Sequence, residues 1–555
     1  MKRNGVVETH RTDVLIIGSG IAGLFSAAEA IRAGVHVTVV SKSAMGRGNS
    51  SYYSGGGIVL PVEGMEPEEH YRRAVSSGRN LNDRSLIVKL VEEAGRVPDY
   101  LKSIGIPLVY MRGYGFNQGP LWRWGGDYTL GCLRRDLKES AALHEGIMVC
   151  KILTDSEGVA GAIGYDARTE TFIDYRTRQI VLASGGCAGL YSRSTNSFSN
   201  GGEIYALALE AGATLRDMEF VQFLPLCDVH RPLHRLIEVW GRLTNVDGED
   251  VVAKYNLPED PIRMARDQTS IAIMRELQQG LGIDGGLTLD LTQMPDELWC
   301  DHPRGRQVIP FFKKKYRKTQ AVKICPAAHY FMGGIAAGPS GETDVPGLFS
   351  AGEVTGGTNG ANRQDGNALG EAMVFGPIAG RNAAKRAKSA DCPDQKKTAV
   401  RWVKDTLGRL ESGRNRKSTG QMTPAALRGR LREVMWEGAG VVRNASALEK
   451  ASVDIDELRR DGLTRLAPRT PNELRAALEA MGETTTARMI VESAMRREES
   501  RGAHLREDYP EVDDAEWLAN TFIRKEGEEW HFEKRAIGED IPLFDESTVH
   551  DGIGE

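Results

Sequence analysis

Residues 12–42 read TDVLIIGSGIAGLFSAAEAIRAGVHVTVVSK, and this stretch decides the fold. An apolar strand, VLII, leads into Gly18, Gly20 and Gly23 in the spacing G-x-G-x-x-G, followed by an alanine-rich helix and a second strand, VHVTVV. In such a unit the first glycine makes the tight turn, the second lets the backbone approach a pyrophosphate, and the third lets the helix pack on the strand. The stretch therefore predicts a dinucleotide site at the helix N-terminus.

The end of the second strand argues against an ordinary NAD site. A NAD-binding unit carries an acidic residue there for the ribose, but this chain has Ser41 followed by Lys42. FAD is not excluded. Two further strands run into glycine-rich turns, RQIVLASGGCAGLY (178–191) and GLFSAGEVTGG (347–357). We therefore expect one α/β nucleotide-binding domain assembled from separated segments, with inserted modules between them.

Composition narrows the class of protein. A chain of 555 residues is long enough for two to four domains. Because 71 Lys and Arg stand against 76 Asp and Glu without a dense basic run, we expect no nucleic-acid partner. Seven cysteines lie far apart without C-x-x-C, so we expect no metal site or iron–sulfur cluster in this chain. No run approaches ~18 apolar residues, so we expect no transmembrane segment and a cytoplasmic location.

A series of ordered motifs carries a family resemblance. In chain order they are GSGIAG (18–23), SSYYSGGGI (50–58), VLASGGCAGLY (181–191), DMEFVQF (217–223), CPAAHYFMGGI (325–335), GLFSAGE (347–353), GANRQDGNAL (360–369) and SRGAHLREDYPE (500–511). Together they resemble the flavoprotein subunit of succinate dehydrogenase and fumarate reductase, a family that includes aspartate oxidase. The resemblance implies a Rossmann-like FAD-binding domain (1–222 and 336–390), an inserted α+β capping domain (223–335) and a C-terminal helical domain (391–555).

The resemblance also implies a reaction and the residues that perform it. Hydride would pass between flavin N5 and a carbon of a C–C bond next to a carboxylate. His329 and Arg363 match residues that bind a substrate carboxylate, and Arg266, in MARDQTS, matches the arginine that exchanges a proton on the opposite face. Glu238 stands near the family's proton path. Electrons would pass to or from an iron–sulfur subunit or a ferredoxin-like carrier.

The side chains at this site suit such chemistry. An arginine fork binds a carboxylate bidentately, and a histidine adds a donor near neutral pH. Simpler interpretations stay open for two of them. Arg363 could pair with Glu371, and Arg266 followed by Asp267 could be a salt-bridged helix end.

Several segments are expected to hold FAD. Glu353 resembles the acid that contacts the ribose, and Glu203 stands where the family has Asp against the flavin. The expected cofactor contacts are Gly18, Gly20, Ile21, Ala22, Gly23, Ser41, Lys42, Ser50, Ser51, Gly56, Gly57, Ala183, Gly185, Glu203, Glu353, Asn367, Ala368 and Leu369.

The chain departs from the family pattern at three places. Ser50 replaces the histidine that binds FAD covalently in membrane-complex members, so we expect non-covalent FAD. Leu224 replaces the histidine of F-x-Q-x-H-P-T, a second carboxylate ligand, and the R-G-E-G segment after Glu238 is missing. We therefore expect a substrate other than fumarate, with its identity open. Two alternatives are an aspartate-oxidase-like amine oxidation and a flavin electron-transfer subunit without its own carbon substrate.

The C-terminal third has a helical pattern. From about residue 390 apolar residues recur at three- and four-residue spacing. Thr423-Pro424 and Thr470-Pro471 predict helix starts with proline at the first helical position. We expect this region to serve in packing and partner docking, or only to stabilise the capping module.

Overall fold

The computed structural model describes residues 7–61, 65–111, 114–117, 125–230, 242–257, 266–293, 321–391, 393, 396–414 and 420–537. Its central element is a five-stranded parallel sheet in the order β18-β11-β2-β3-β7. The three strands that lead into glycine-rich turns, β2, β11 and β18, lie next to one another in this sheet. The strands are β2 (Val14–Ile17), β3 (Val37–Ser41), β7 (Ala142–Glu145), β11 (Gln179–Leu182) and β18 (Leu348–Ser350).

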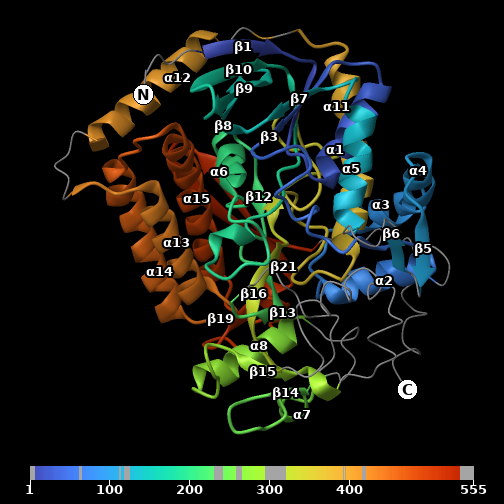
Figure 1. The fold of residues 1–555 in the computed structure, drawn as a ribbon, viewed down its shortest axis with the longest axis vertical. Helices are drawn as coiled ribbons and strands as arrows, with labels where there is room; N and C mark the ends of the chain where they lie inside the picture. Colours follow the sequence, from blue (N-terminus) through green and yellow to red (C-terminus); the bar gives the residue numbers. More distant parts are fainter. Residues whose placement is uncertain are drawn as a thin grey trace.

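Helices α1 (Ile21–Arg32) and α11 (Asn367–Ala387) run parallel in close contact beside this sheet (Figure 1). Glycines bring the backbones together. A Cβ on Gly376 would lie 2.6 Å from the Ala22 oxygen, and one on Gly380 would lie 2.1 Å from the Ser26 oxygen. The Ser26 hydroxyl donates to the Gly376 carbonyl at 2.8 Å. The N-terminal ends of both helices therefore lie on the same side of the sheet.

Further elements of the N-terminal part surround the central sheet. A four-stranded sheet has the order β1-β10-β9-β8, and a three-stranded one has the order β4-β6-β5. Their strands are β1 (Val7–Arg11), β8 (Ile147–Asp155), β9 (Gly158–Asp166), β10 (Thr171–Arg176), β4 (Gly57–Val59), β5 (Leu108–Met111) and β6 (Tyr114–Asn117). The helices are α2 (Pro67–Ser77), α3 (Arg84–Ala94), α4 (Val97–Ser103), α5 (Gly125–Leu137), η1 (Ala188–Leu190) and α6 (Glu203–Glu210).

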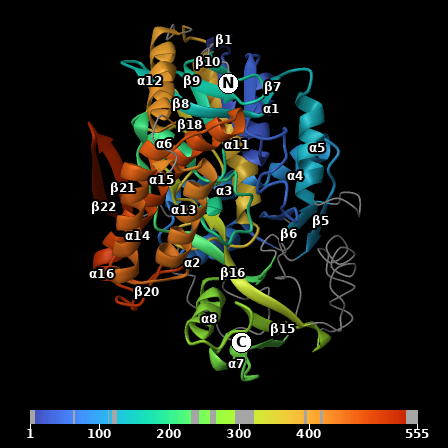
Figure 2. The same ribbon diagram turned by 60° about the vertical axis from the view of Figure 1, so that its left-hand side comes forward.

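A second β module projects from the body at the bottom of both views (Figure 1, Figure 2). We call it the projecting module. Its antiparallel sheet has the order β13-β16-β15-β14 around a small apolar core of its own. The long strands β13 and β16 reach back to the body and carry site residues on their way. The elements are β13 (Val221–Asp228), β14 (Arg242–Thr244), α7 (Val251–Lys254), α8 (Arg266–Gln278), β15 (Leu287–Asp290), η2 (Leu291–Gln293) and β16 (Ala321–Phe331).

The predicted helices of the C-terminal third are present. Thr423 and Thr470 cap α13 and α15, each with proline at the start, and Thr470 forms a capping box with Glu473. Within the described ranges no helix has both the length and the apolar character needed to cross a membrane. The elements are α12 (Lys396–Arg414), α13 (Pro424–Ala439), β19 (Val442–Arg443), α14 (Ala445–Glu457), η4 (Leu458–Gly462), η5 (Leu463–Arg465), α15 (Pro471–Arg496), β20 (Leu505–Arg506) and α16 (Asp514–Trp517).

The helical pattern did not predict the end of the chain. Strands β21 (Ala519–Glu526) and β22 (Glu529–Ala536) form a hairpin around Gly527, whose φ is 62°. The hairpin joins β12 (Leu215–Arg216) and β17 (Gly334–Ile335) in one sheet. The first five residues of β21 are all buried, while β22 has only half-buried and exposed residues, so neither strand carries a helical repeat.

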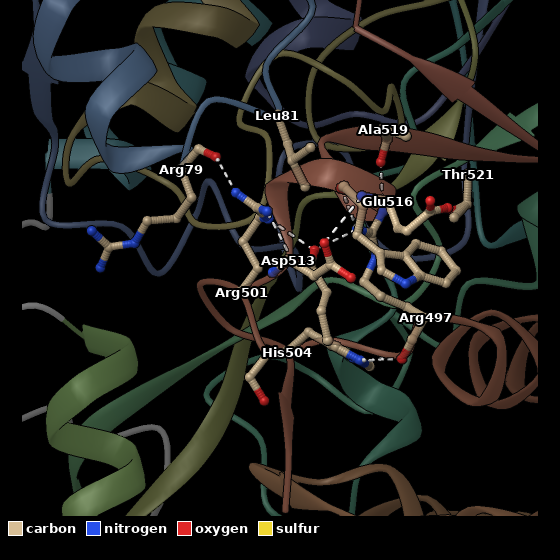
Figure 3. A network of polar contacts seen from close by, with 12 residues as sticks. Arg79, Leu81, Arg497, Arg501, His504, Asp513, Glu516, Ala519 and Thr521 are labelled. Atoms are coloured by element: carbon tan, nitrogen blue, oxygen red, sulfur yellow. Dashed lines mark hydrogen bonds and ion pairs between the residues drawn. The ribbon is translucent and has the colours of Figure 1, made fainter. Parts of the chain in front are cut away.

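Buried charges fasten this C-terminal segment to the body (Figure 3). Arg497 donates to Glu219 at 2.6 Å and to Glu499 at 2.7 Å, and both carboxylates are fully buried. Arg501 donates to Glu499 at 2.8 Å and to the Arg79 carbonyl at 3.4 Å. The C-terminal segment therefore contacts the turn that contains Arg79 through the side chain of Arg501.

Candidate active site

One cavity of about 410 Å³ lies at the carboxyl ends of the central strands. Ligands of open α/β sheets bind at this edge. Of the residues predicted to contact the cofactor or the substrate, those lining the cavity are Gly18, Gly20, Ile21, Ala22, Ser41, Lys42, Ser50, Ser51, Gly56, Gly57, Ala183, Gly185, Glu203, Arg266, His329, Glu353, Arg363, Ala368 and Leu369.

Three of the predicted residues are placed elsewhere or not described. Gly23 does not line the cavity, and a Cβ there would lie 2.0 Å from the Gly18 oxygen, so this glycine serves helix packing. Asn367 also lies outside the lining. Its amide donates to Asn359 and contacts His70, both at 3.1 Å, which fixes the start of α11. Glu238 lies outside the described residues.

The glycine turn leaves room for a phosphate at the N-terminus of α1. Gly18 has φ 120°, and a Cβ there would lie 2.2 Å from the Ala183 oxygen, so only glycine fits. Gly20 at the N-cap provides no side-chain cap, while Ser51 accepts from the Ile21 N–H at 3.2 Å. The turn thus has the geometry that a pyrophosphate needs.

The cavity lining next to this turn also contains a buried polar group that has room for a ligand contact. The Ser184 hydroxyl lines the cavity and is buried without a hydrogen-bond partner in the described part of the chain. Such a group needs a bound partner. Ser41, the last residue of β3, pairs with Ser19 at 2.8 Å, and Lys42 follows it in place of an acid.

Lys42 and Glu203 form an ion pair on the cavity wall. Lys42 Nζ lies 2.6 Å from Glu203 and donates to the Ser199 carbonyl at 2.5 Å. Glu479, from α15, lies 3.7 Å from the same amine. Burial lowers the pKa of Lys42, but the two carboxylates outweigh it and the pKa is raised. Lys42 therefore stays charged, and Glu479 of α15 contacts this residue of the cavity wall.

Glu353 is a carboxyl group with a strongly shifted pKa. It lines the cavity, and its Oε1 accepts the Phe331 N–H at 3.1 Å. Burial raises its pKa to about 7, against the Phe331 N–H and the Arg363 charge, which lower it. A Cβ at Gly186 would lie 2.2 Å from Oε1, so glycine there is required for this placement.

Two arginines that line the cavity, Arg266 and Arg363, donate to one amide oxygen, that of Gln222. Gln222 Oε1 accepts from Arg266 Nη1 at 2.9 Å and from Arg363 Nη2 at 3.1 Å. The Gln222 amide nitrogen donates to Asn362 at 2.7 Å and to the Arg363 carbonyl at 2.9 Å. Arg266 Nη2 donates to Asp365 at 2.5 Å. Sequence reasoning missed Gln222 and Asp365, although both lie inside quoted motifs, and a buried glutamine in the apolar strand FVQF was the available signal.

Arg363 is buried without a carboxylate of its own among the described residues. Its guanidinium lies 4.5 Å from the centre of the Tyr330 ring, and its Nε has no partner there. Glu371, the predicted alternative partner, instead accepts from Tyr330 and Asn359. Burial, and then the nearby Arg266, lower the pKa of Arg363 to about 10. A buried cation in this state is stabilised by a bound anion.

His329 and Leu224 complete this end of the cavity. Thr195 fixes the histidine ring through a 2.7 Å contact with Nδ1, and Asn196 donates to the His329 carbonyl at 2.6 Å. Leu224 lines the cavity and packs with Cys227 and Ala327 in a small buried apolar cluster. The cavity therefore has basic and apolar side chains at the same end.

Fold and site together define an FAD-binding oxidoreductase. A family model described as "FAD binding domain" matches residues 13–369, and one described as "Fumarate reductase flavoprotein C-term" matches residues 428–541. The chain belongs to the succinate dehydrogenase and fumarate reductase flavoprotein family, and its cofactor is FAD.

Named relatives and a solved structure agree with this assignment. A fumarate reductase (CoM/CoB) subunit of Methanothermobacter marburgensis is 32% identical, over 94% of this chain and 98% of the relative. L-aspartate oxidase of Streptomyces coelicolor is 30% identical, over 92% and 91%. A structure of E. coli quinol fumarate reductase FrdA superposes with a TM-score of 0.86 at 26% identity, over 97% of this chain and 99% of that one.

Proposed function

We propose that this oxidoreductase reduces or forms a C–C double bond next to a carboxylate group. The observation that carries the proposal is the pair of cationic groups, Arg266 and Arg363, held on the single oxygen of Gln222 at the cavity. Two guanidinium groups this close repel each other, and an anion between them removes that repulsion. Carboxylate is the anion that their planar forks match.

Each residue has a part in the reaction. FAD, when bound, supplies or accepts hydride at N5. Arg363 and His329 bind the carboxylate and stabilise the negative charge that develops next to it, because fixed donors act strongly in a buried site. Arg266 holds the proton that is exchanged with the other carbon. An arginine is a weak acid, so this transfer requires replacement of the proton by a neighbouring group.

The substrate is proposed to carry one carboxylate and an apolar group. Leu224, which lines the cavity and packs in an apolar cluster, presents no donor for a second carboxylate, whereas it can cover an alkyl or aryl substituent. Such a substrate is an α,β-unsaturated monocarboxylate. We also propose that FAD is held without a covalent bond, since Ser50 stands at the tethering position and its hydroxyl is hydrogen-bonded to Asn196 and Asn200.

Electrons are proposed to come from an iron–sulfur protein. The Methanothermobacter relative is named as one subunit of an enzyme, which supports a partner chain for this protein as well. The proposal predicts that a reduced ferredoxin-like protein reduces the bound flavin directly.

An anaerobic stopped-flow experiment tests the function. The flavin is reduced with dithionite, and its absorbance is followed after fumarate, crotonate or cinnamate is added. We expect reoxidation by crotonate or cinnamate to be at least about tenfold faster than by fumarate, since an unpaired second carboxylate opposes binding. Acid precipitation is expected to release the flavin into the supernatant.

Other outcomes would favour the rival functions. Hydrogen peroxide formed from L-aspartate and oxygen would show an aspartate-oxidase-like activity. Indifference to every enoate, combined with rapid exchange with an iron–sulfur protein, would overturn the proposal and leave a role in electron transfer.

A further inference from the structure

We infer that Asp365 supplies the proton that Arg266 delivers to the substrate, an inference that rests on the proposed function. Arg266 Nη2 donates to Asp365 Oδ1 at 2.5 Å, while Nη1 donates to Gln222 at 2.9 Å. These two acceptors fix the plane of the guanidinium. The arginine proposed for proton transfer is thus in direct contact with a group that can exchange protons.

Arg266 and Asp365 differ in the exposure of their side chains to solvent. The Arg266 side chain is 8% exposed, whereas that of Asp365 is 38% exposed. Asp365 also lines the cavity. A buried guanidinium has no direct access to bulk water, so its proton must return through a neighbour. Asp365 touches both the solvent and the arginine and can therefore fill that role.

The backbone holds Asp365 in place. The Gly366 N–H donates to the same Oδ1 at 2.9 Å, and Gly366 is the N-cap of α11 with φ 78°. These contacts fix the carboxyl group of Asp365 beside the Arg266 guanidinium.

The proton step balances as follows in the reducing direction. One carbon of the double bond receives hydride with its electron pair, and the other receives a proton from a guanidinium N–H of Arg266. Before the transfer Asp365 takes up a proton from water, and as the Arg266 N–H bond breaks the protonated carboxyl group gives that proton to the guanidinium nitrogen and becomes a carboxylate again. Concerted transfer avoids a free neutral arginine, which is costly because a guanidinium is effectively always protonated. The electrons come from the reduced iron–sulfur carrier, or from dithionite in the test.

Reoxidation of the dithionite-reduced holoenzyme by crotonate tests this role with the variants Asp365→Asn and Asp365→Glu. We expect Asp365→Asn to lower kcat by about 100-fold or more while KM stays within about threefold. Asp365→Glu keeps a carboxyl group and is expected to recover at least about a tenth of the parent rate. Binding of butyrate, followed by the flavin difference spectrum, is expected to be unchanged in both variants, because the carboxylate-binding residues remain.

A double-mutant comparison with Arg266 distinguishes a role of Asp365 in proton supply from a role as a structural ion-pair partner. If Asp365 acts through Arg266, then Asp365→Asn costs less than about threefold in an Arg266→Lys background. The inference is overturned by a parent-like kcat in Asp365→Asn, by an equal loss in both backgrounds, or by loss of butyrate binding together with rate. A wild-type protein that no enoate reoxidises overturns the proposed function as well. If crotonate reoxidises the wild-type protein and the Asp365→Asn variant at similar rates, the inference is overturned and the proposed function is not.

Discussion

At the scale of single residues, the proposed function gives Leu224 the role of limiting the charge that a substrate can bring into the cavity. Replacing it with histidine adds a donor at the apolar end. We expect Leu224→His to raise kcat/KM for fumarate by about tenfold or more and to lower it for crotonate, because the second carboxylate gains a partner and the methyl group loses apolar contact. Anaerobic flavin reoxidation with both substrates measures the change.

Leu224→Met is the matched control, because it keeps an apolar side chain of similar volume against Cys227 and Ala327. It is expected to leave the preference for crotonate in place. Equal preferences in the histidine and methionine variants would show that Leu224 does not face the substrate.

The raised pKa of Glu353 is expected to make the free energy of unfolding depend on pH. In the unfolded chain its pKa is the ordinary 4.5, and burial raises it to about 7 in the folded protein. Between these values the unfolded chain releases a proton that the folded protein keeps, so stability falls as pH rises and levels off above pH 7. A shift of this size is worth on the order of 3 kcal/mol.

We expect flavin-free Glu353→Gln to lose less stability than the parent between pH 5 and pH 8, because glutamine does not ionise. Urea unfolding at both pH values measures the difference. Parallel losses in the two proteins would mean that Glu353 is ionised throughout.

At the scale of elements, sequence signals located those parts whose cause is local. Thr423 and Thr470 mark the starts of α13 and α15 because a capping hydroxyl and a following proline act within one turn. The glycine spacing at residues 18–23 likewise fixed the strand–turn–helix. Local signals did not predict the hairpin of β21 and β22, because β21 is stabilised by pairing with β12, about 300 residues earlier.

Helix α8 is held by a turn of the body. Arg79, with φ 55°, donates to Asp267 at 2.7 Å, next to Arg266 at the start of α8. Figure 3 shows its guanidinium pointing away from the network that holds its carbonyl. We expect Arg79→Ala to lower kcat about tenfold and to increase quenching of flavin fluorescence by iodide. The reason is that α8 of the projecting module loses its ion pair with Arg79 of the body.

Arg79→Lys keeps the charge and is expected to restore most of the rate. Quenching that is the same in Arg79→Ala and the parent would show that the Asp267 pair does not keep the cavity closed.

At the scale of the whole molecule, the contacts that escaped prediction join distant segments. Gln222 meets Arg363 from 141 residues away and Arg266 from 44. Lys42 was predicted near the cofactor, but its partners Glu203 and Glu479 come from α6 and α15. Single-sequence patterns carry no information on such pairs, because nothing local marks which distant residue each of these side chains contacts. Helix α15 thereby contacts a residue of the cavity wall through Glu479.

This architecture makes Glu479 important for holding FAD. Glu479 is nearly buried among Lys42, Arg428 and Arg475. Burial opposes its ionisation, but these cations outweigh burial and lower the pKa of Glu479. A carboxylate with a lowered pKa stabilises the fold above its unfolded pKa of 4.5, and this contribution is lost as pH falls through the folded value.

We therefore expect Glu479→Gln to speed release of FAD about tenfold at pH 7, because uncompensated buried cations shift Lys42 on the cavity wall. The rise of flavin fluorescence after dilution measures the rate. Acidification below about pH 4.5 is expected to speed release in the parent more than in the variant, since the variant has no proton to take up there. Arg430→Ala is the control, because its pair with Asp454 at 3.0 Å is exposed and contributes little. Equal release from Glu479→Gln and Arg430→Ala would mean that the C-terminal helices only pack against the FAD-binding part, and that Lys42 needs Glu203 alone.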